Sequence, residues 1–246
     1  MAPVTQNRWV TFDCYGTLIN WQAGLSAIVA GVAGDRATDV ASVYDVHASE
    51  AEHEQPQRAY KDVYVTALLR AAADAHVPLS EADARFSLSS WGVLRPFDDA
   101  ESLLAMLREK GYRVGVLTNC DDDLFEITHR RFRMPFDLFV TGERIRGYKP
   151  APWHFRAFEL MTGVRKTNWV HVGSSWYTDI APARELGIKH VWFDRVGSCE
   201  ADRLPAPYAA DAGEVIDLVD RLMSDRVGGG RITRVATHEM AAPCAI

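Results

Sequence analysis

Asp13 is the first residue whose type and position could support covalent chemistry. It follows the apolar run RWVTF at residues 8–12 and precedes a Gly-containing turn, so its carboxylate is expected at the end of a strand. A carboxylate held in this way can attack a substrate and form an ester that a second step hydrolyses. Asp also caps turns and helices, and the residue alone leaves both roles open. The Thr17 hydroxyl could hold a carboxylate oxygen or cap the next helix.

The elements that must position such side chains alternate between strand and helix. Strand-like runs cover residues 8–12, 112–117, 169–172 and 189–193, and helical patterns cover residues 98–110, 121–131, 152–162 and 179–186. This alternation predicts an α/β fold with a Rossmann-like doubly wound parallel sheet. Ligands of such sheets bind at the carboxyl ends of the strands. Asp13, Thr118 and Ser174 all lie at such ends.

One long segment, residues 20–95, breaks the alternation. It is rich in Ala, Glu and His at helical spacing and has almost no strand signal. We expect it to form a helical cap inserted into a discontinuous core made of residues 1–19 and 96–222. Residues 223–246 contain three successive glycines and no strong periodicity, which predicts a weakly ordered C-terminal tail.

The bulk properties are those of an ordinary globular protein. The chain has 246 residues, a net charge of -6, 48% hydrophobic and 24% charged residues, so a sizeable core is expected and a basic surface for nucleic acid is not. No segment has the pattern of a secretion signal or approaches the roughly 20 apolar residues that cross a bilayer. We therefore expect a cytoplasmic protein with no nucleic-acid or membrane partner.

The cysteines and histidines do not form a metal-binding pattern. The four cysteines are scattered, and we interpret them as reduced thiols; they are Cys14, Cys120, Cys199 and Cys244. The first two fall within polar segments of interest, where small buried residues pack well, so packing is preferred over a reactive thiol. The eight histidines include no HExxH or paired arrangement.

Four separated segments together resemble the haloacid dehalogenase superfamily. They read FDCYGTL at residues 12–18, LTN at 117–119, YKP at 148–150 and HVGSSWYTD at 171–179, and the resemblance extends over about 220 residues that include the core and the cap. Each piece alone is weak, whereas four in order are specific. The resemblance implies the same doubly wound core with an inserted cap.

The resemblance also implies roles for the polar residues. Asp13 would be the nucleophile and Lys149 the cation that keeps it ionised. Thr118 and Asn119 would hold the anionic end of the substrate, although both could simply cap the following helix. Asp179 would orient Lys149 or a hydrolytic water. Four further residues are expected to contact the substrate: Tyr15, Thr17, Ser174 and Ser175.

Two positions favour carbon–halogen over phosphate-ester hydrolysis. Phosphatases of the superfamily have an acidic residue at the position of Tyr15, which protonates the leaving alcohol, whereas a phenol is a poor acid near neutral pH and halide leaves without a proton. They also have an Asp at the position of Ser174 that helps hold magnesium. The DxYGT form resembles that of the (S)-2-haloacid dehalogenases, which implies a short 2-haloacid substrate and neither metal nor cofactor.

Two departures from the dehalogenase pattern leave alternatives open. Those enzymes have an arginine in the cap that receives the halide, and residues 43–57 contain none. The run from Val172 to Asp179 is also one residue longer. A magnesium-dependent phosphatase and a non-catalytic binding protein of the same fold are the alternatives, and a homodimer is compatible with each. We expect the cap to close over the strand ends, with Trp21 and Trp91 as aromatic walls near its hinges.

Overall fold

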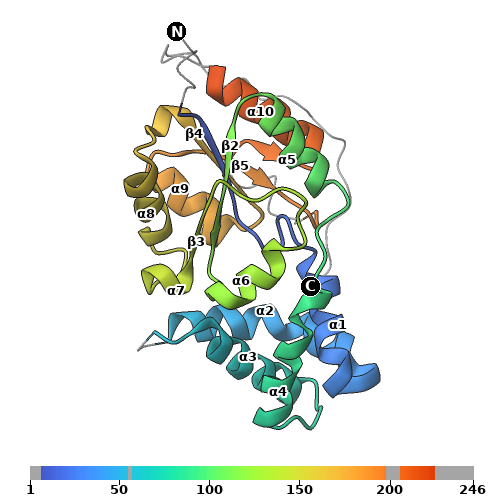
Figure 1. Ribbon diagram of the computed structural model, residues 1–246. Coiled ribbons are helices and arrows are strands. Elements are labelled where there is room, and N and C mark those ends of the chain that lie inside the picture. The colour runs from blue at the N-terminus through green and yellow to red at the C-terminus, as the bar shows by residue number, and fades with distance from the viewer. Residues whose placement is uncertain (1–6, 55–56, 198–205, 225–246) are drawn as a thin grey trace.

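The core is a six-stranded sheet in which all strands are parallel (Figure 1). The computed structural model describes residues 7–54, 57–197 and 206–224. The strand order is β3-β2-β1-β4-β5-β6. The strands span Trp9–Phe12 (β1), Arg113–Thr118 (β2), Leu138–Thr141 (β3), Trp169–Gly173 (β4), Lys189–Phe193 (β5) and Tyr208–Ala209 (β6). Because β1 pairs with both β2 and β4, the ends of these three strands lie side by side.

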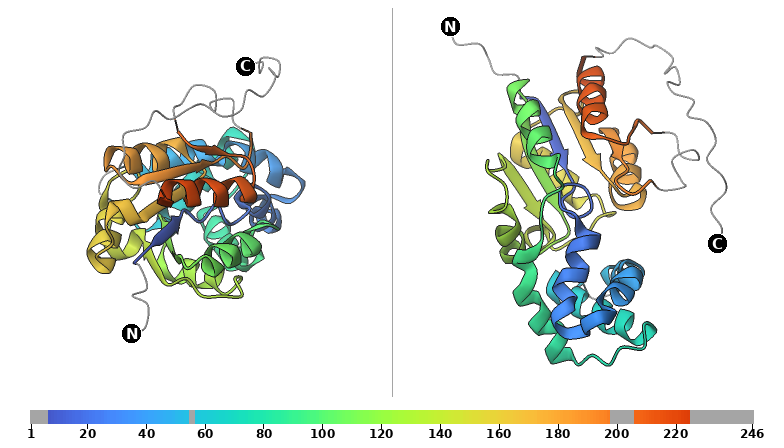
Figure 2. Two further views of the ribbon diagram at one scale, coloured as in Figure 1. Left: turned by 90° about the horizontal axis from the view of Figure 1, so that it is seen from above. Right: turned by 90° about the vertical axis from the view of Figure 1, so that its right-hand side faces the viewer.

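Helices cover both faces of the sheet, as a doubly wound fold requires (Figures 1 and 2). Helices α5 (Ala100–Glu109) and α10 (Ala212–Ser224) pack on one face, and α8 (Trp153–Thr162) and α9 (Ala181–Glu185) pack on the other. Both α5 and α10 bury apolar residues spaced three and four apart. These are Leu103, Leu104 and Leu107 in α5, and Val215, Ile216 and Val219 in α10. The remaining core helices are α6 (Asp122–His129), α7 (Gly142–Ile145) and η3 (Lys166–Asn168).

The cap is a helical lobe at the carboxyl ends of the strands (Figure 2). Its elements are α1 (Trp21–Ala33), η1 (Gly34–Arg36), α2 (Ala37–His53), α3 (Tyr60–Asp74), α4 (Glu81–Ser87) and η2 (Leu88–Val93). The two connections to the core run beside each other, because Asn20 N donates to Arg95 O at 3.0 Å and Phe97 N donates to Leu18 O at 2.9 Å. The two ends of the segment expected as the cap, residues 20 and 95, are thus adjacent in space.

Hydrogen bonds from core side chains dock the cap. Helix α3 has no capping side chain of its own, and the core residue Asp121 accepts from its first two backbone amides, Tyr60 N at 2.9 Å and Lys61 N at 3.0 Å. Tyr148 Oη donates to Arg58 O at 2.6 Å nearby. The cap therefore rests directly on the loops that follow β2 and β3.

The sequence predicted four of the six strands to within a residue or two, and missed two. Both missed strands lie at the edges of the sheet: β3 is only half-buried, and β6 has two residues, too few to show a period. The helix expected at residues 179–186 begins earlier, with the π-helical turn η4 (Trp176–Ile180). Helix α10 continues through Ser224, two residues into the expected tail, and residues 225–246 lie outside the described residues. No helix in the described part of the chain is both long and apolar enough to cross a membrane.

Candidate active site

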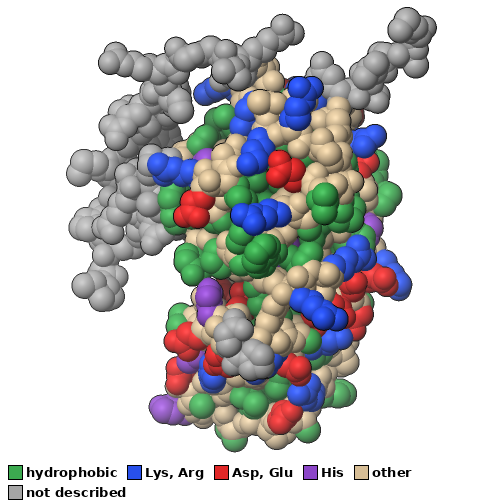
Figure 3. All heavy atoms as spheres, turned by 90° about the vertical axis from the view of Figure 1, so that its left-hand side faces the viewer, with side chains coloured by type: hydrophobic (Ala, Val, Ile, Leu, Met, Phe, Trp, Pro, Cys, Tyr) green, Lys and Arg blue, Asp and Glu red, His purple; other side chains and the backbone are tan. Residues whose placement is uncertain are grey.

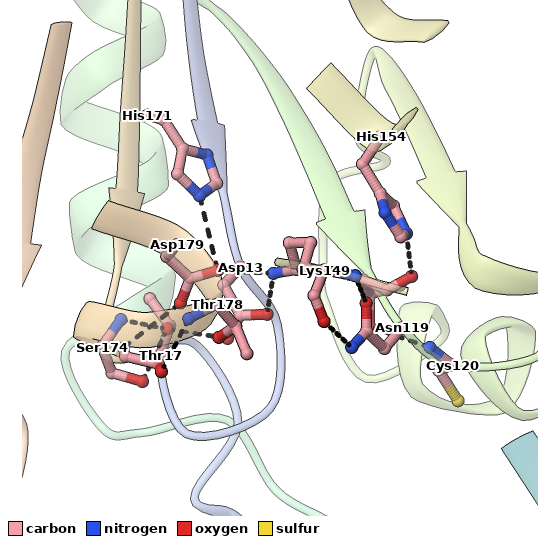
Figure 4. Close-up of polar contacts among 12 residues, drawn as sticks. Asp13, Thr17, Asn119, Cys120, Lys149, His154, His171, Ser174, Thr178 and Asp179 are labelled. Atoms are coloured by element: carbon pink, nitrogen blue, oxygen red, sulfur yellow. Dashed lines mark hydrogen bonds and ion pairs between the residues drawn. The ribbon is translucent and has the colours of Figure 1, made fainter. Parts of the chain in front are cut away.

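Three neighbouring strand ends bring the predicted residues together (Figure 4). Asp13 follows β1, Asn119 follows β2 and Ser174 follows β4, and these strands are adjacent in the sheet. Lys149 reaches the same place from the loop between α7 and α8, and its side chain is buried. Residues more than 130 positions apart in sequence therefore share one polar cluster.

The Lys149 ammonium lies between two carboxylates. Its Nζ is 2.7 Å from Asp13 Oδ1 and 2.6 Å from Asp179 Oδ1. Asp179 is fully buried, whereas the side chain of Asp13 keeps 13% of its exposure. Asp13 is therefore the carboxylate that a substrate could reach, and Asp179 holds the ammonium from behind.

Thr17 holds the second oxygen of Asp13. Its Oγ1 donates to Asp13 Oδ2 at 2.9 Å, accepts from Ser174 N at 3.0 Å and lies 3.1 Å from Ser174 Oγ. Gly16, at φ +91°, makes the turn that brings Thr17 back onto Asp13, in a backbone region that favours glycine. Both oxygens of the expected nucleophile are thus fixed in direction.

Ser175 and the π-helical turn position Asp179. Ser175 N donates to Asp179 Oδ2 at 3.2 Å, and Ser175 Oγ accepts from Thr178 N at 3.2 Å. Ile180 N reaches back to Ser175 O at 3.2 Å, the five-residue step of a π-turn. The wide turn accommodates the long run from Val172 to Asp179. Ser175 was expected to contact substrate, and in the structure its polar groups serve the turn and Asp179.

The pKa values follow from burial and the shared cation. Burial raises the pKa of Asp13 to about 6, against the opposing influence of Lys149. Burial also acts to raise the pKa of Asp179, but the charge and hydrogen bond of Lys149 together with the contact to His171 outweigh it and lower that pKa to about 2. The two carboxylates raise the pKa of Lys149 despite its burial. At neutral pH the cluster therefore holds an ammonium and two carboxylates.

The side chain of Asn119 forms hydrogen bonds with the main chain of Lys149. Its Oδ1 accepts from Lys149 N at 2.7 Å, and its Nδ2 donates to Lys149 O at 3.2 Å and to Glu52 Oε2 at 3.1 Å. Thr118 is buried, and its carbonyl accepts from His154 Nε2 at 2.9 Å. The side-chain donors of Asn119 are thus engaged with the protein, although this residue was expected to hold the substrate.

Tyr15 joins the core to the cap. Its Oη lies 2.9 Å from Thr128 Oγ1 and accepts from Trp91 Nε1 at 3.2 Å. Its ring lies 5.7 Å from that of Trp21 and 5.6 Å from that of Trp91, both at edge-on angles. The two cap tryptophans therefore lie beside the residue two positions after Asp13, where the sequence placed them.

The sequence analysis missed two groups in the site, Glu52 and His171. Glu52 reaches the site from the last turn of α2, where it continues the buried stripe formed by Tyr44 and Ala48. An acidic residue at helical spacing on an apolar stripe was the sequence signal that could have identified it. His171 is fully buried, its Nδ1 lies 2.9 Å from Thr11 Oγ1 and its Nε2 lies 3.6 Å from Asp179 Oδ1. Burial lowers its pKa, so the ring is neutral.

The donor set does not fit a magnesium ion. Magnesium requires near-octahedral oxygen ligands with negative charge among them. Here the two carboxylates already share the Lys149 ammonium, and the oxygen donors next to them are the hydroxyls of Thr17 and Ser174. Among the described residues no group of three or more His, Cys, Asp or Glu side chains could hold a metal.

Cys14 and Cys120 are buried, and burial raises the pKa of both thiols. Thiolate is the reactive form of cysteine, so this agrees with the packing role inferred from the sequence. Cys199 and Cys244 lie outside the described residues.

A pocket of about 300 Å³ opens at the seam between cap and core. Glu52 and His53 border it from the cap, and Lys149, Trp153 and Tyr177 border it from the core. Figure 3 shows this side of the molecule hollowed between its core and cap halves. The pocket gives a small molecule a path from solvent to Lys149.

The chain is similar to a family of known proteins. The family model of haloacid dehalogenase-like hydrolases matches residues 8–187. Haloacetate dehalogenase H-2 of Moraxella sp. (strain B) is 26% identical over 106 residues, 42% of this chain and 47% of that protein. Glyceraldehyde 3-phosphate phosphatase of Pyrococcus abyssi (strain GE5 / Orsay) is 30% identical over 109 residues, 43% of this chain and 45% of that protein. The matches thus span about half the length of these curated relatives.

A solved structure extends the likeness of fold to most of the chain. The L-2-haloacid dehalogenase RSc1362 superposes with a TM-score of 0.76 at 24% identity, covering 87% of this chain and 98% of that chain. This likeness includes the inserted cap as well as the sheet. With the family model matching 180 of 246 residues, the chain belongs to the haloacid dehalogenase-like hydrolases.

Proposed function

We propose that this hydrolase releases halide from a short 2-haloacid and gives a 2-hydroxy acid, without a metal. One observation carries the proposal: the Lys149 ammonium lies between Asp13 and Asp179, at 2.7 and 2.6 Å, while Asp13 alone is open to a ligand. An ammonium there supports an ionised nucleophile at neutral pH.

In the first step Asp13 attacks C2 of the substrate. A C–O bond forms while the carbon–halogen bond breaks, and halide leaves with the bonding electrons. Thr17 and Lys149 fix the two carboxylate oxygens, so the attacking atom is held in a set direction. Halide needs no proton, which suits a site whose Tyr15 hydroxyl is already engaged by Thr128 and Trp91.

In the second step water attacks Cγ of the Asp13 ester. The bond from Cγ to the ester oxygen breaks, the 2-hydroxy acid leaves with that oxygen, and a water oxygen remains on Asp13. One water proton goes to the product hydroxyl and the other is released. Lys149 stays beside Asp13 throughout, held by Asp179 at 2.6 Å, and offsets the charge that develops on the carboxyl group.

A magnesium-dependent phosphatase is the second candidate, favoured by the 30% identity to a glyceraldehyde 3-phosphate phosphatase over 109 residues. It would have to protonate a leaving alcohol without the acid that Tyr15 replaces. Burial raises the pKa of Tyr15 well above its usual value, which makes this phenol a weaker acid still. A non-catalytic role would leave the Asp13–Lys149 pair, whose carboxylate keeps 13% of its exposure, without a purpose.

The test measures which product leaves and whether a metal is required. Purified protein is given 2-chloropropionate or glyceraldehyde 3-phosphate, with and without EDTA, and halide and phosphate release are followed in parallel. We expect halide release that EDTA does not change. Phosphate release that EDTA abolishes and magnesium restores would establish the phosphatase instead.

A further inference from the structure

Glu52 brings an acidic group from the cap to the catalytic cluster. It lies in the last turn of α2 and borders the same pocket as Lys149, from the opposite domain. Its Oε2 accepts from Asn119 Nδ2 at 3.1 Å. Among residues 7–54, 57–197 and 206–224, Oε1 has no hydrogen-bond partner in the protein and Glu52 makes no ion pair. One oxygen of this carboxyl group is therefore available to a ligand.

Given the charges around the pocket, an ionised Glu52 would weaken the binding of an anionic substrate. Lys149 is the pocket's lysine, no arginine borders it among the described residues, and the charge of Lys149 is shared by Asp13 and Asp179. An ionised Glu52 would add a further negative charge to a cluster whose carboxylates already outnumber its cation. At the low effective dielectric of a partly buried site, such repulsion weakens anion binding strongly.

We propose that Glu52 is a proton-dependent specificity residue: in its protonated form it donates from Oε1 to the carboxylate of the substrate, and in its ionised form it excludes that anion. Oε2 can accept from Asn119 in both forms. This inference rests on the proposed function, because it concerns how the same site admits a short carboxylic acid. It also gives the cap a side chain that contacts the substrate. Residues 43–54 of the cap contain no arginine that could have this role.

The surroundings of Glu52 bring the pH at which its carboxyl group loses the proton close to neutral. Burial raises the pKa of Glu52 to about 7, opposed by the hydrogen bond from Asn119 and the charge of Lys149. The titratable groups that face it are Tyr44, Asp45 and His53 from its own helix, Tyr60 from α3, and Asp13, Tyr148 and Lys149 from the core. Asp13 and Asp45 act with burial to retain the proton.

Binding of propionate, a carboxylate without a leaving group, tests the inference without relying on turnover. Calorimetry measures the dissociation constant between pH 7 and 8.5 for the wild type and for Glu52→Gln, which keeps the size of the side chain and supplies a permanent donor. Glu50→Gln is the matched control, because it makes the same chemical change on the same helix, and Glu50 is exposed and does not border the pocket. Repeating the titrations in two buffers with different ionisation enthalpies counts the protons taken up.

The wild type should approach a tenfold loss of affinity per pH unit above pH 7 and take up close to one proton per propionate. Glu52→Gln should show neither effect and should bind about 30-fold more tightly than the wild type at pH 8.5, which follows from a pKa of about 7. Glu50→Gln should behave as the wild type does.

A wild-type affinity that does not change with pH, or equal slopes for the wild type and Glu52→Gln, overturns the inference. So does a lack of propionate binding at pH 7 by both proteins. Chloride release from 2-chloropropionate is scored separately. If propionate binding is proton-linked but no chloride appears, the proposed reaction fails and the role of Glu52 stands. If chloride appears but propionate binding does not depend on pH, the proposed reaction stands and the role of Glu52 fails.

Discussion

Gly173 leaves the space that Asp179 occupies. A Cβ atom at position 173 would lie 2.4 Å from Asp179 Cβ, closer than any real contact, so the last residue of β4 must lack a side chain for Asp179 to reach Lys149. The placement of Asp179 beside Lys149 therefore depends on a glycine that supplies no side chain of its own.

Gly173→Ala should displace Asp179 and lower kcat on the order of 10²-fold, because a shift of about 1 Å in a positioning group is costly to catalysis. Overpacking should also destabilise the fold by about 1–3 kcal/mol. Gly31→Ala is the control, since a Cβ at that position on α1 meets nothing within 4 Å. Halide release and urea unfolding of both variants measure the two effects. Unchanged turnover in Gly173→Ala would mean that Asp179 does not need this placement.

Lys149→Ala should lower turnover on the order of 10²-fold or more, because Asp13 loses the cation that orients it and opposes its protonation. Removing the ammonium also leaves Asp179 buried without a cation, which costs about 3–5 kcal/mol if both carboxylates stay ionised. Lys166→Ala, at an exposed lysine that contacts Leu186 O, is the control. A folded Lys149→Ala protein with near-normal kcat would remove Lys149 from the reaction.

Activity should decrease below about pH 6. Burial raises the pKa of Asp13 to about 6, and only the ionised carboxylate is a nucleophile, so protonation at lower pH removes the reactive form. The measurement is log(kcat/KM) for 2-chloropropionate against pH, which should approach a slope of one on the acid side. In Glu52→Gln this acid limb should remain. An acid limb near pH 4 would show that Lys149 outweighs burial at Asp13.

The sheet, the cap and most of the site could be predicted from the sequence, because their signals are local. Buried strands such as WVTF end at a polar residue, and the carboxyl ends of parallel strands meet at one edge. The Asp13–Lys149 contact followed from the family resemblance of two short segments. Strands β3 and β6 were missed because they lie at the edges of the sheet, where β3 is only half-buried and β6 has two residues.

The sequence could not show which polar groups the protein itself uses. Asn119 and Ser175 were expected to contact substrate, yet the hydrogen bonds that engage them come from Glu52, Lys149 and Asp179, and these depend on how distant segments pack. A π-turn cannot be inferred from one additional residue in a loop. The position of Glu52 on the apolar stripe of α2 is a weak signal, and its place in the site is clear only from its hydrogen bond to Asn119 and the pocket that it borders.

Isotope labelling separates attack by Asp13 from direct attack by water, since both routes give the same 2-hydroxy acid. In the covalent route the product hydroxyl oxygen comes from Asp13, and a water oxygen replaces it on the enzyme. With enzyme in excess over 2-chloropropionate in ¹⁸O-water, the label should therefore appear in the peptide that contains Asp13 and not in the product. Mass spectrometry of the digested protein and of the hydroxy acid measures both.

Repeated turnover should then transfer the label, because each new ester is built from an oxygen that water supplied in the cycle before. The geometry supports this order of events: Thr17 and Lys149 hold Asp13 by both oxygens, so the carboxylate that is regenerated returns to the same position. Fully labelled product after a single turnover, with an unlabelled Asp13 peptide, would leave Asp13 as a general base at most. Labelled peptide with unlabelled product requires the ester.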